Sequence, residues 1–261
     1  MRLILLFALM TGGLSATSFT FSGHFENPDW FRRFNSIQPS PFQLGADRSE
    51  IVQDPQRGHT VLKVKYPKGE IDSHPSGASW ITYLGGKFES MTVSYYVKFE
   101  KDFTFVKGGK LPGLIGGARH GVPHSTLTGG FKPDGTDGWS ARVMWRKDGR
   151  VVQYIYHPDQ PDKWGEDFPW MIDGKPAQFL LGRWHHLKTE IRMNTPTQNN
   201  GIIRSWFDGQ EALEVTNLRF RDIPTIAIDA LYFSTFFGGD EPDWAPPRDV
   251  HAFFDDFVVR G

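Results

Sequence analysis

The stretch GWSARVMWRKDGRVVQYIYHP, residues 138–158, reads as two alternating strands joined at Lys147-Asp148-Gly149. A two-residue turn at Asp148-Gly149 would place Arg142 opposite Ile155. A three-residue loop with Gly149 in the left-handed conformation instead places Arg142 opposite Tyr154. The choice of loop decides which side chains share a face, because opposed residues point to the same side of a sheet.

The three-residue loop separates the hairpin into a polar face and an apolar face. It also places Ser140 opposite Tyr156. The apolar face is expected to join the core, and it consists of Trp139, Ala141, Val143, Trp145, Val151, Gln153 and Ile155. The polar face is expected to line a ligand groove on the concave side of a curved sheet, and it consists of Ser140, Arg142, Met144, Val152, Tyr154 and Tyr156. The alternative is a solvent-exposed sheet face that carries tyrosines, which antiparallel sheets permit.

Short apolar or alternating segments recur along the chain with turn residues between them, which indicates a β-sandwich or barrel. Examples are TVLKVKYP (60–67), MTVSYYVKFE (91–100), DALYFSTFFGG (229–239) and AFFDDFVVR (252–260). The segment from Gly182 to Glu214 resembles the hairpins of concanavalin A-like and laminin G-like jelly rolls. We therefore predict an all-β jelly roll, a concanavalin A-like sandwich of two curved antiparallel sheets, as a single domain over residues 17–261.

The first 16 residues have the layout of a secretory signal peptide, with Arg2, an apolar run from Leu3 to Met10 and small residues near Ala16. A buried first strand is the alternative. The apolar run is too short to span a bilayer. The formal charge of the whole chain is -1, which argues against a protein that coats a nucleic acid or a membrane. We expect a secreted protein that functions as a monomer. The chain has no cysteine, so the fold must rely on its apolar core.

Positive charge is concentrated around the hairpin. Between Lys98 and Arg150 there are ten Lys and Arg against five Asp and Glu, which favours an anionic ligand. In this region a strand that ends at Val106 is predicted to run into a turn at KGGKLPG, residues 107–113. There glycines allow close approach of the backbone and Pro112 fixes the turn.

The combination of YYVKFEKDFTFVKGGKLPGLIGG (95–117), GWSARVMWR (138–146) and YIYHP (154–158) resembles polysaccharide lyases of family 14 and the related family 20. The resemblance extends from about Gly77 to the C-terminus, and it implies a jelly roll that cleaves alginate or glucuronan, with an acidic polysaccharide as the partner. It also implies an active site made of a lysine from GKLPG, SxR and YxY, which here are Lys110, Ser140, Arg142, Tyr154 and Tyr156. Lys107 is the competing lysine.

A uronate lyase removes the proton at C5, next to a carboxylate, and expels the oxygen at C4. The carboxylate must be neutralised, a task that suits Arg142 through bidentate pairing, with Lys110 as a second charge. Tyrosine can act as base and acid when adjacent cations lower its pKa from about 10. Tyr156 is the favoured proton-transfer group because its small neighbour Ser140 leaves room for a sugar. Tyr154 would then orient the substrate.

Other side chains are candidates for substrate binding or for rival functions. Lys107, Arg146, His120 and His124 are expected to contact the substrate, and either histidine is an alternative base. The mechanism requires no cofactor or metal, and a structural calcium at the edge of the jelly roll is compatible with it.

Two rival functions remain open. A glycoside hydrolase would need paired carboxylates such as ExDxE, a string that the sequence lacks. A lectin-like carbohydrate-binding jelly roll could use aromatic side chains such as Trp80, Trp164, Trp170 and Trp244.

Overall fold

The computed structural model describes residues 19–27, 30–34, 45–119, 122–123 and 129–261. The predicted signal peptide, His120 and His124 lie outside the described residues. The chain forms a short helix α1 (Trp30–Phe34) and the strands β1 (Thr20–Gly23), β2 (Ser49–Asp54), β3 (His59–Tyr66), β4 (Ala78–Phe88), β5 (Ser90–Phe99), β6 (Gly108–Arg119), β7 (Val122–Pro123), β8 (Gly138–Arg146), β9 (Val151–Tyr156), β10 (Glu166–Pro169), β11 (Met171–Ile172), β12 (Lys175–Pro176), β13 (Trp184–Arg192), β14 (Gly201–Phe207), β15 (Gln210–Leu218), β16 (Ile228–Phe237) and β17 (Val250–Arg260).

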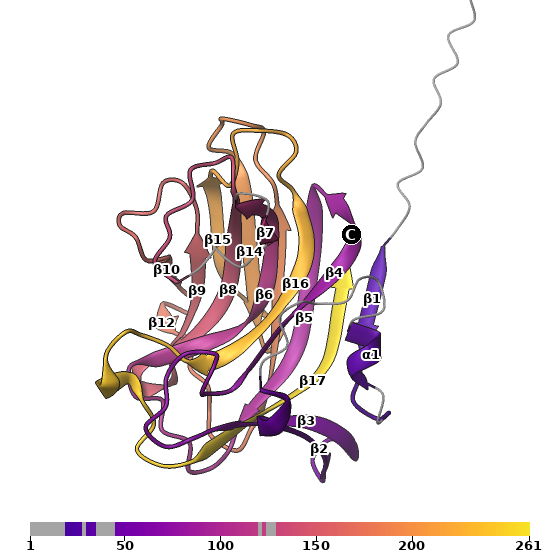
Figure 1. Cartoon of the computed structure of the whole chain (residues 1–261), viewed down its shortest axis with the longest axis vertical. Coiled ribbons are helices and arrows are strands. Elements are labelled where there is room, and N and C mark those ends of the chain that lie inside the picture. Colours follow the sequence, from indigo (N-terminus) through magenta and orange to yellow (C-terminus); the bar gives the residue numbers. More distant parts are fainter. Residues whose placement is uncertain (1–18, 28–29, 35–44, 120–121, 124–128) are drawn as a thin grey trace, which may run out of the picture.

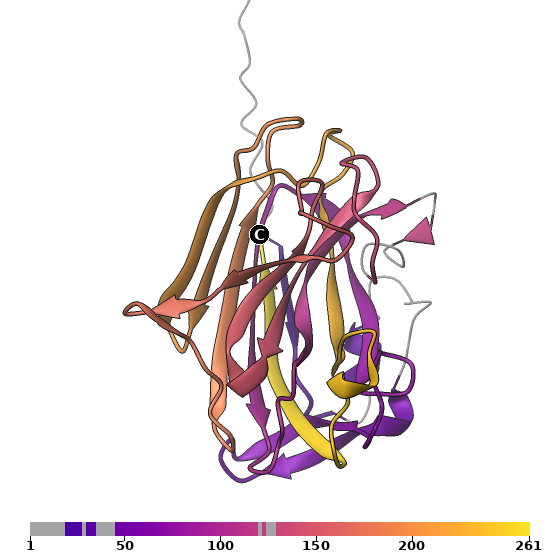
Figure 2. The ribbon, with the colours of Figure 1, turned by 90° about the vertical axis from the view of Figure 1, so that its left-hand side faces the viewer.

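Two antiparallel sheets form a sandwich, which confirms the predicted all-β fold. The inner sheet, so named because it carries the pocket described below, has the order β10-β9-β8-β6-β16-β4, with β7 paired to β6. The outer sheet has the order β15-β14-β13-β5-β17-β3-β2, with β1 paired to β17. Figure 1 shows β9, β8, β6, β16 and β4 side by side, with β14 and β15 behind them. Figure 2 shows the pronounced curvature of β17, drawn in yellow.

The core lies between the sheets and is rich in aromatic side chains. Trp80 stacks on Phe233 with ring centroids 3.8 Å apart, and Tyr95 stacks on Phe257 at 4.9 Å. Trp170 is fully buried. Apolar burial on this scale is the main source of stability in a fold without disulfides. Among the described residues, no helix is long and apolar enough to cross a membrane.

The segment KGGKLPG is not a turn, so that prediction was wrong. Residues 108–113 lie inside β6, a central strand of the inner sheet, and the register with β8 shifts between Leu111 and Gly113. This is a β-bulge, one of the few places where a sheet accepts proline. Both Leu111 and Leu114 point into the core, although they are three residues apart. The bulge therefore lets Lys110 point away from the core while apolar residues on both sides of Pro112 stay buried.

Candidate active site

The hairpin has the predicted three-residue register. Arg142 pairs with Tyr154 and Ser140 pairs with Tyr156. The amide N–H of Arg146 donates to the carbonyl of Arg150, which closes the loop at 2.7 Å. Gly149 has φ 75°, as expected, and Asp148 is also left-handed with φ 63°. The predicted apolar face belongs to the core except for Gln153, which is polar but buried.

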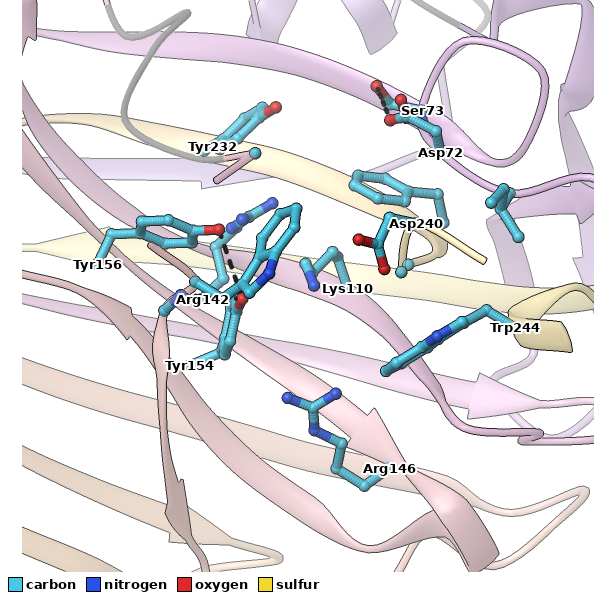
Figure 3. Close-up of a pocket in the computed structure, with 17 residues that line it drawn as sticks. Asp72, Ser73, Lys110, Arg142, Arg146, Tyr154, Tyr156, Tyr232, Asp240 and Trp244 are labelled. Carbon is cyan, nitrogen blue, oxygen red and sulfur yellow. Dashed lines mark hydrogen bonds between the residues drawn. The ribbon is translucent and has the colours of Figure 1, made fainter. Parts of the chain in front are cut away.

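A pocket of about 640 Å³ lies on the face of the inner sheet that points away from the core. Four of the five residues implied by the family resemblance line it, namely Lys110, Arg142, Tyr154 and Tyr156, together with Arg146. Figure 3 shows these side chains converging from neighbouring strands. The pocket has further lining residues that the sequence did not indicate as site residues. They include Ile71, Asp72, Ser73, Tyr232, Phe236, Gly238 and Asp240.

Two predicted site residues lie outside the pocket wall, and a third lines the pocket but is already paired. Ser140 is on the expected face but is fully buried, so it does not line the pocket that the described residues form. Lys107 pairs instead with Asp243 at the surface and is absent from the pocket wall. Arg146 lines the pocket while its guanidinium holds Asp167 through two hydrogen bonds of 2.8 and 2.6 Å.

Arg142 is a buried cation without an acidic partner among the described residues. Only 1% of its surface is exposed. Its Nη1 donates to the Ser234 hydroxyl at 3.1 Å, its guanidinium carbon lies 5.3 Å from the Tyr232 ring centroid, and its Nε has no hydrogen-bond partner. An unpaired buried charge is costly, so this guanidinium is well suited to an anionic ligand.

Lys110 is a second cation of the pocket, half-buried and without a carboxylate at ion-pair distance among the described residues. Its ammonium contacts the Met144 Sδ at 3.1 Å and lies 4.3 Å from the centroid of the Tyr154 ring. Burial, followed by the charges of Arg142 and Arg146, lowers the pKa of Lys110 well below its usual 10.5. A carboxylate that entered the pocket would offset the cost of burying the charges of Arg142 and Lys110.

The two tyrosine hydroxyls are 3.4 Å apart, and Figure 3 shows them pointing toward each other. Tyr154 accepts the amide N–H of Gly165 at 3.0 Å, and Tyr156 accepts that of Gly130 at 3.3 Å. Gly165 is required here because a Cβ at this position would lie 2.9 Å from atoms of both tyrosine rings.

The expectation that cations lower the tyrosine pKa is wrong for Tyr154. Burial, and secondly the neighbouring Tyr156, raise the pKa of Tyr154 above 10, although Arg142 and Arg146 act in the opposite direction. Tyr154 therefore remains a neutral phenol at ordinary pH. Its proton can be donated to the oxygen of Tyr156.

The candidate sugar-stacking tryptophans separate into two groups. Trp80 and Trp170 are core residues, whereas Trp164 and Trp244 line the pocket. His157 is not among the lining residues of the pocket, and its Nε2 lies 2.9 Å from a carboxylate oxygen of Glu166. Elsewhere, His59, Asp255 and Asp256 bring ligand atoms within 4.8 Å of one another, which is a spacing compatible with a metal ion. Arg57, however, donates to both of these carboxylates.

The sequence model of the family Polysaccharide lyase 14 matches residues 54–257, which is well over half of the chain. The chain therefore belongs to polysaccharide lyase family 14 and is a polysaccharide lyase. No curated protein sequence matches it significantly. Membership in a lyase family favours an enzyme over the lectin-like alternative and over a hydrolase.

Solved structures agree with this assignment. The marine PL-14 alginate lyase from Aplysia kurodai is 26% identical with a TM-score of 0.77, and the match covers 92% of this chain and 97% of that one. The alginate lyase vAL-1 from a Chlorella virus is 24% identical with a TM-score of 0.74, covering 90% and 97%. A glucuronan lyase from the fungus Trichoderma reesei is 15% identical with a TM-score of 0.54, covering 92% and 94%. The last two show the fold alone.

Proposed function

We propose that the chain is a secreted polyuronate lyase that cleaves alginate or glucuronan by β-elimination and leaves unsaturated uronide ends. The observation that carries the proposal is a pair of cations, Arg142 and Lys110, that form no ion pair within the described part of the chain and lie beside two tyrosines in one pocket. Alginate is the preferred substrate because the 26%-identical structure is that of an alginate lyase. The signal-like residues 1–16 support secretion.

Arg142 neutralises the uronate carboxylate. Its planar fork can form two parallel hydrogen bonds with the carboxylate oxygens, and low exposure strengthens them. This lowers the energy of the carbanion that forms at C5 as its proton leaves. Lys110 adds a second positive charge on the adjacent strand β6, and a bound carboxylate favours its protonated form.

Tyr156 acts as the base and then as the acid. The Tyr156 oxygen accepts the Gly130 amide N–H at 3.3 Å and lies 3.4 Å from the Tyr154 hydroxyl, and these contacts hold it in the pocket. The phenolate takes the C5 proton, the electron pair forms the C4–C5 double bond, and the C4–O bond breaks. The leaving oxygen then receives the proton from Tyr156.

A substrate panel tests this function. The protein is incubated separately with polymannuronate, polyguluronate and polyglucuronate, and the ultraviolet absorbance of the unsaturated uronide is followed. We expect the absorbance to rise with at least one polymer, and mass spectrometry should show oligosaccharides without the added water of hydrolysis. Binding without any absorbance change on every polymer would overturn the proposal.

A further inference from the structure

A buried polar bridge crosses the apolar core directly behind Arg142. Gln153 lies on β9 between Val152 and Tyr154, which lie on the opposite face of the sheet, and its side chain points into the core with no exposure. A glutamine amide in such a place is costly unless all its hydrogen bonds are made. Its contacts therefore indicate what it holds.

The bridge joins both sheets. The Gln153 Nε2 donates to the main-chain carbonyl of Arg142 at 3.0 Å. The Gln153 Oε1 accepts the hydroxyls of Ser205 at 3.1 Å and Thr189 at 3.4 Å. These two residues pair across β13 and β14 of the outer sheet, and both are buried. The Arg142 carbonyl can only accept a hydrogen bond, so it fixes the amide orientation, with Nε2 toward Arg142 and Oε1 toward the two hydroxyls.

We propose that Gln153 is a positioning residue that holds Arg142 in place for the lyase reaction, with Ser205 and Thr189 as its anchor in the outer sheet. The inference rests on the proposed function. The Arg142 side chain donates a hydrogen bond only to Ser234 among the described residues, so few contacts fix the guanidinium directly. Its place in the pocket depends on its main chain, which Gln153 clamps from the core side.

A second contact of the same kind supports this reading. The Tyr95 hydroxyl of the outer sheet donates to the Pro112 carbonyl at 3.1 Å. Pro112 lies at the bulge that sets the direction of Lys110. The outer sheet therefore contacts the main chain near both cations of the pocket. Near Lys110 the contact is direct, through Tyr95. At Arg142 it is made through Gln153, which Ser205 and Thr189 hold from the outer sheet.

The test is a double-mutant cycle between Gln153→Met and Arg142→Lys on polyuronate, with kcat and KM measured separately. Methionine keeps much of the volume but removes the amide. Displacing a catalytic group by about 1 Å can cost up to about 100-fold, so we expect Gln153→Met to lower kcat/KM by about 10- to 100-fold. In the Arg142→Lys background, where the guanidinium fork is already lost, the same change should cost less than about threefold.

Matched variants separate positioning from general destabilisation. Ile191→Val trims a buried residue of β13 that has no role in the bridge, and it should lower the melting temperature without altering kcat/KM. Ser205→Ala is a milder change, because it removes one anchor hydroxyl and leaves Gln153 in place. It should follow the same pattern, lowering kcat/KM when Arg142 is present and leaving kcat/KM unchanged in the Arg142→Lys variant. The Ser205→Ala variant keeps the test valid if Gln153→Met folds poorly.

Equal losses from Gln153→Met and Ser205→Ala in both backgrounds would overturn the positioning role and leave the proposed function intact. An inactive wild-type protein would overturn both. The inference is supported if both substitutions lower kcat/KM when Arg142 is present and neither does so to a comparable extent in the Arg142→Lys variant.

Discussion

The two sheets each carry a cluster of cations, and the clusters differ in what they pair with. At the outer sheet, Arg57 in the turn between β2 and β3 contacts Asp255 at 3.0 Å and also Asp256, while Lys98 of β5 pairs with Asp54. On the inner sheet, neither Arg142 nor Lys110 has a carboxylate partner within the described part of the chain. The same residue types thus form a closed ion-pair network on one sheet and an open cationic pocket on the other.

The pKa shifts follow this difference. Asp255 and Asp256 raise the pKa of Arg57 although burial opposes the shift, whereas burial and neighbouring cations lower the pKa of Lys110. The outer cations are already stabilised by the folded chain. Asp167 and Asp72 offset only part of the shift at Lys110. An arriving anion would stabilise the inner cations further, and this is what distinguishes a binding site from a structural network.

The largest expected effect is that of Tyr156→Phe. The loss of a proton-transfer group costs about 10²- to 10⁴-fold in rate, so kcat should fall by that range. The ring remains, so a polyuronate oligosaccharide should bind with nearly unchanged affinity, as measured by calorimetry. Tyr154→Phe removes a neighbour of Tyr156 and the acceptor of the Gly165 amide but leaves the proton-transfer group in place, so it should cost much less. Full activity in both variants would exclude the tyrosine mechanism.

Arg142→Ala should lower kcat by about 10²- to 10³-fold, the usual cost of removing a preorganised charge-stabilising group. Arg142 contacts the carboxylate in the ground state as well as in the transition state, so KM should also rise. Thermal unfolding should change little, because the variant removes a buried charge that forms no ion pair with the residues that the structure describes. A normal KM would contradict carboxylate binding by this residue.

Arg57→Ala should show the opposite pattern. It leaves Asp255 buried beside His59 without its main cation, and we expect a loss of about 2 kcal/mol in unfolding free energy, which is below the usual range for buried pairs because Arg57 is partly exposed. Chemical denaturation measures this loss. The kcat on polyuronate should equal that of the wild type at a temperature where both are folded.

The pH dependence of KM should report Lys110. A lysine binds an anion while it is protonated, so KM should rise as pH increases through the pKa of Lys110, which burial places below 10.5. Lys110→Arg keeps its charge at higher pH, and its KM should stay flat over the same interval. Identical profiles for both proteins would show that Lys110 does not bind the carboxylate.

Lys107→Ala should have the smallest effect, less than about twofold on kcat/KM. Its ammonium pairs with Asp243 at the surface, where single ion pairs contribute little. Steady-state kinetics of Lys107→Ala and Lys110→Ala should be measured side by side. We expect Lys110→Ala to resemble Arg142→Ala. A loss equal to that of Lys110→Ala would exchange the roles of the two lysines.

The hairpin could be predicted from the sequence because its register depends on local turn chemistry at Asp148-Gly149. The bulge at Pro112 could not, since it depends on how β6 pairs with β8 and β16, which are far away in the sequence. The raised pKa of Tyr154 depends on burial under residues such as Gly165. Similarly, nothing local distinguishes the core residue Trp80 from the pocket residue Trp244, because the difference lies in which face of the fold each occupies.

The most direct test of the account compares Arg142→Ala with Arg57→Ala on the same polyuronate, by the ultraviolet absorbance of the unsaturated product. We predict that Arg57→Ala produces it at the wild-type rate despite its lower stability, and that Arg142→Ala produces it at least about 100 times more slowly despite normal folding. Equal rates in the two variants, or a greater loss with Arg57→Ala, would contradict the claim that the unpaired cation marks the active site.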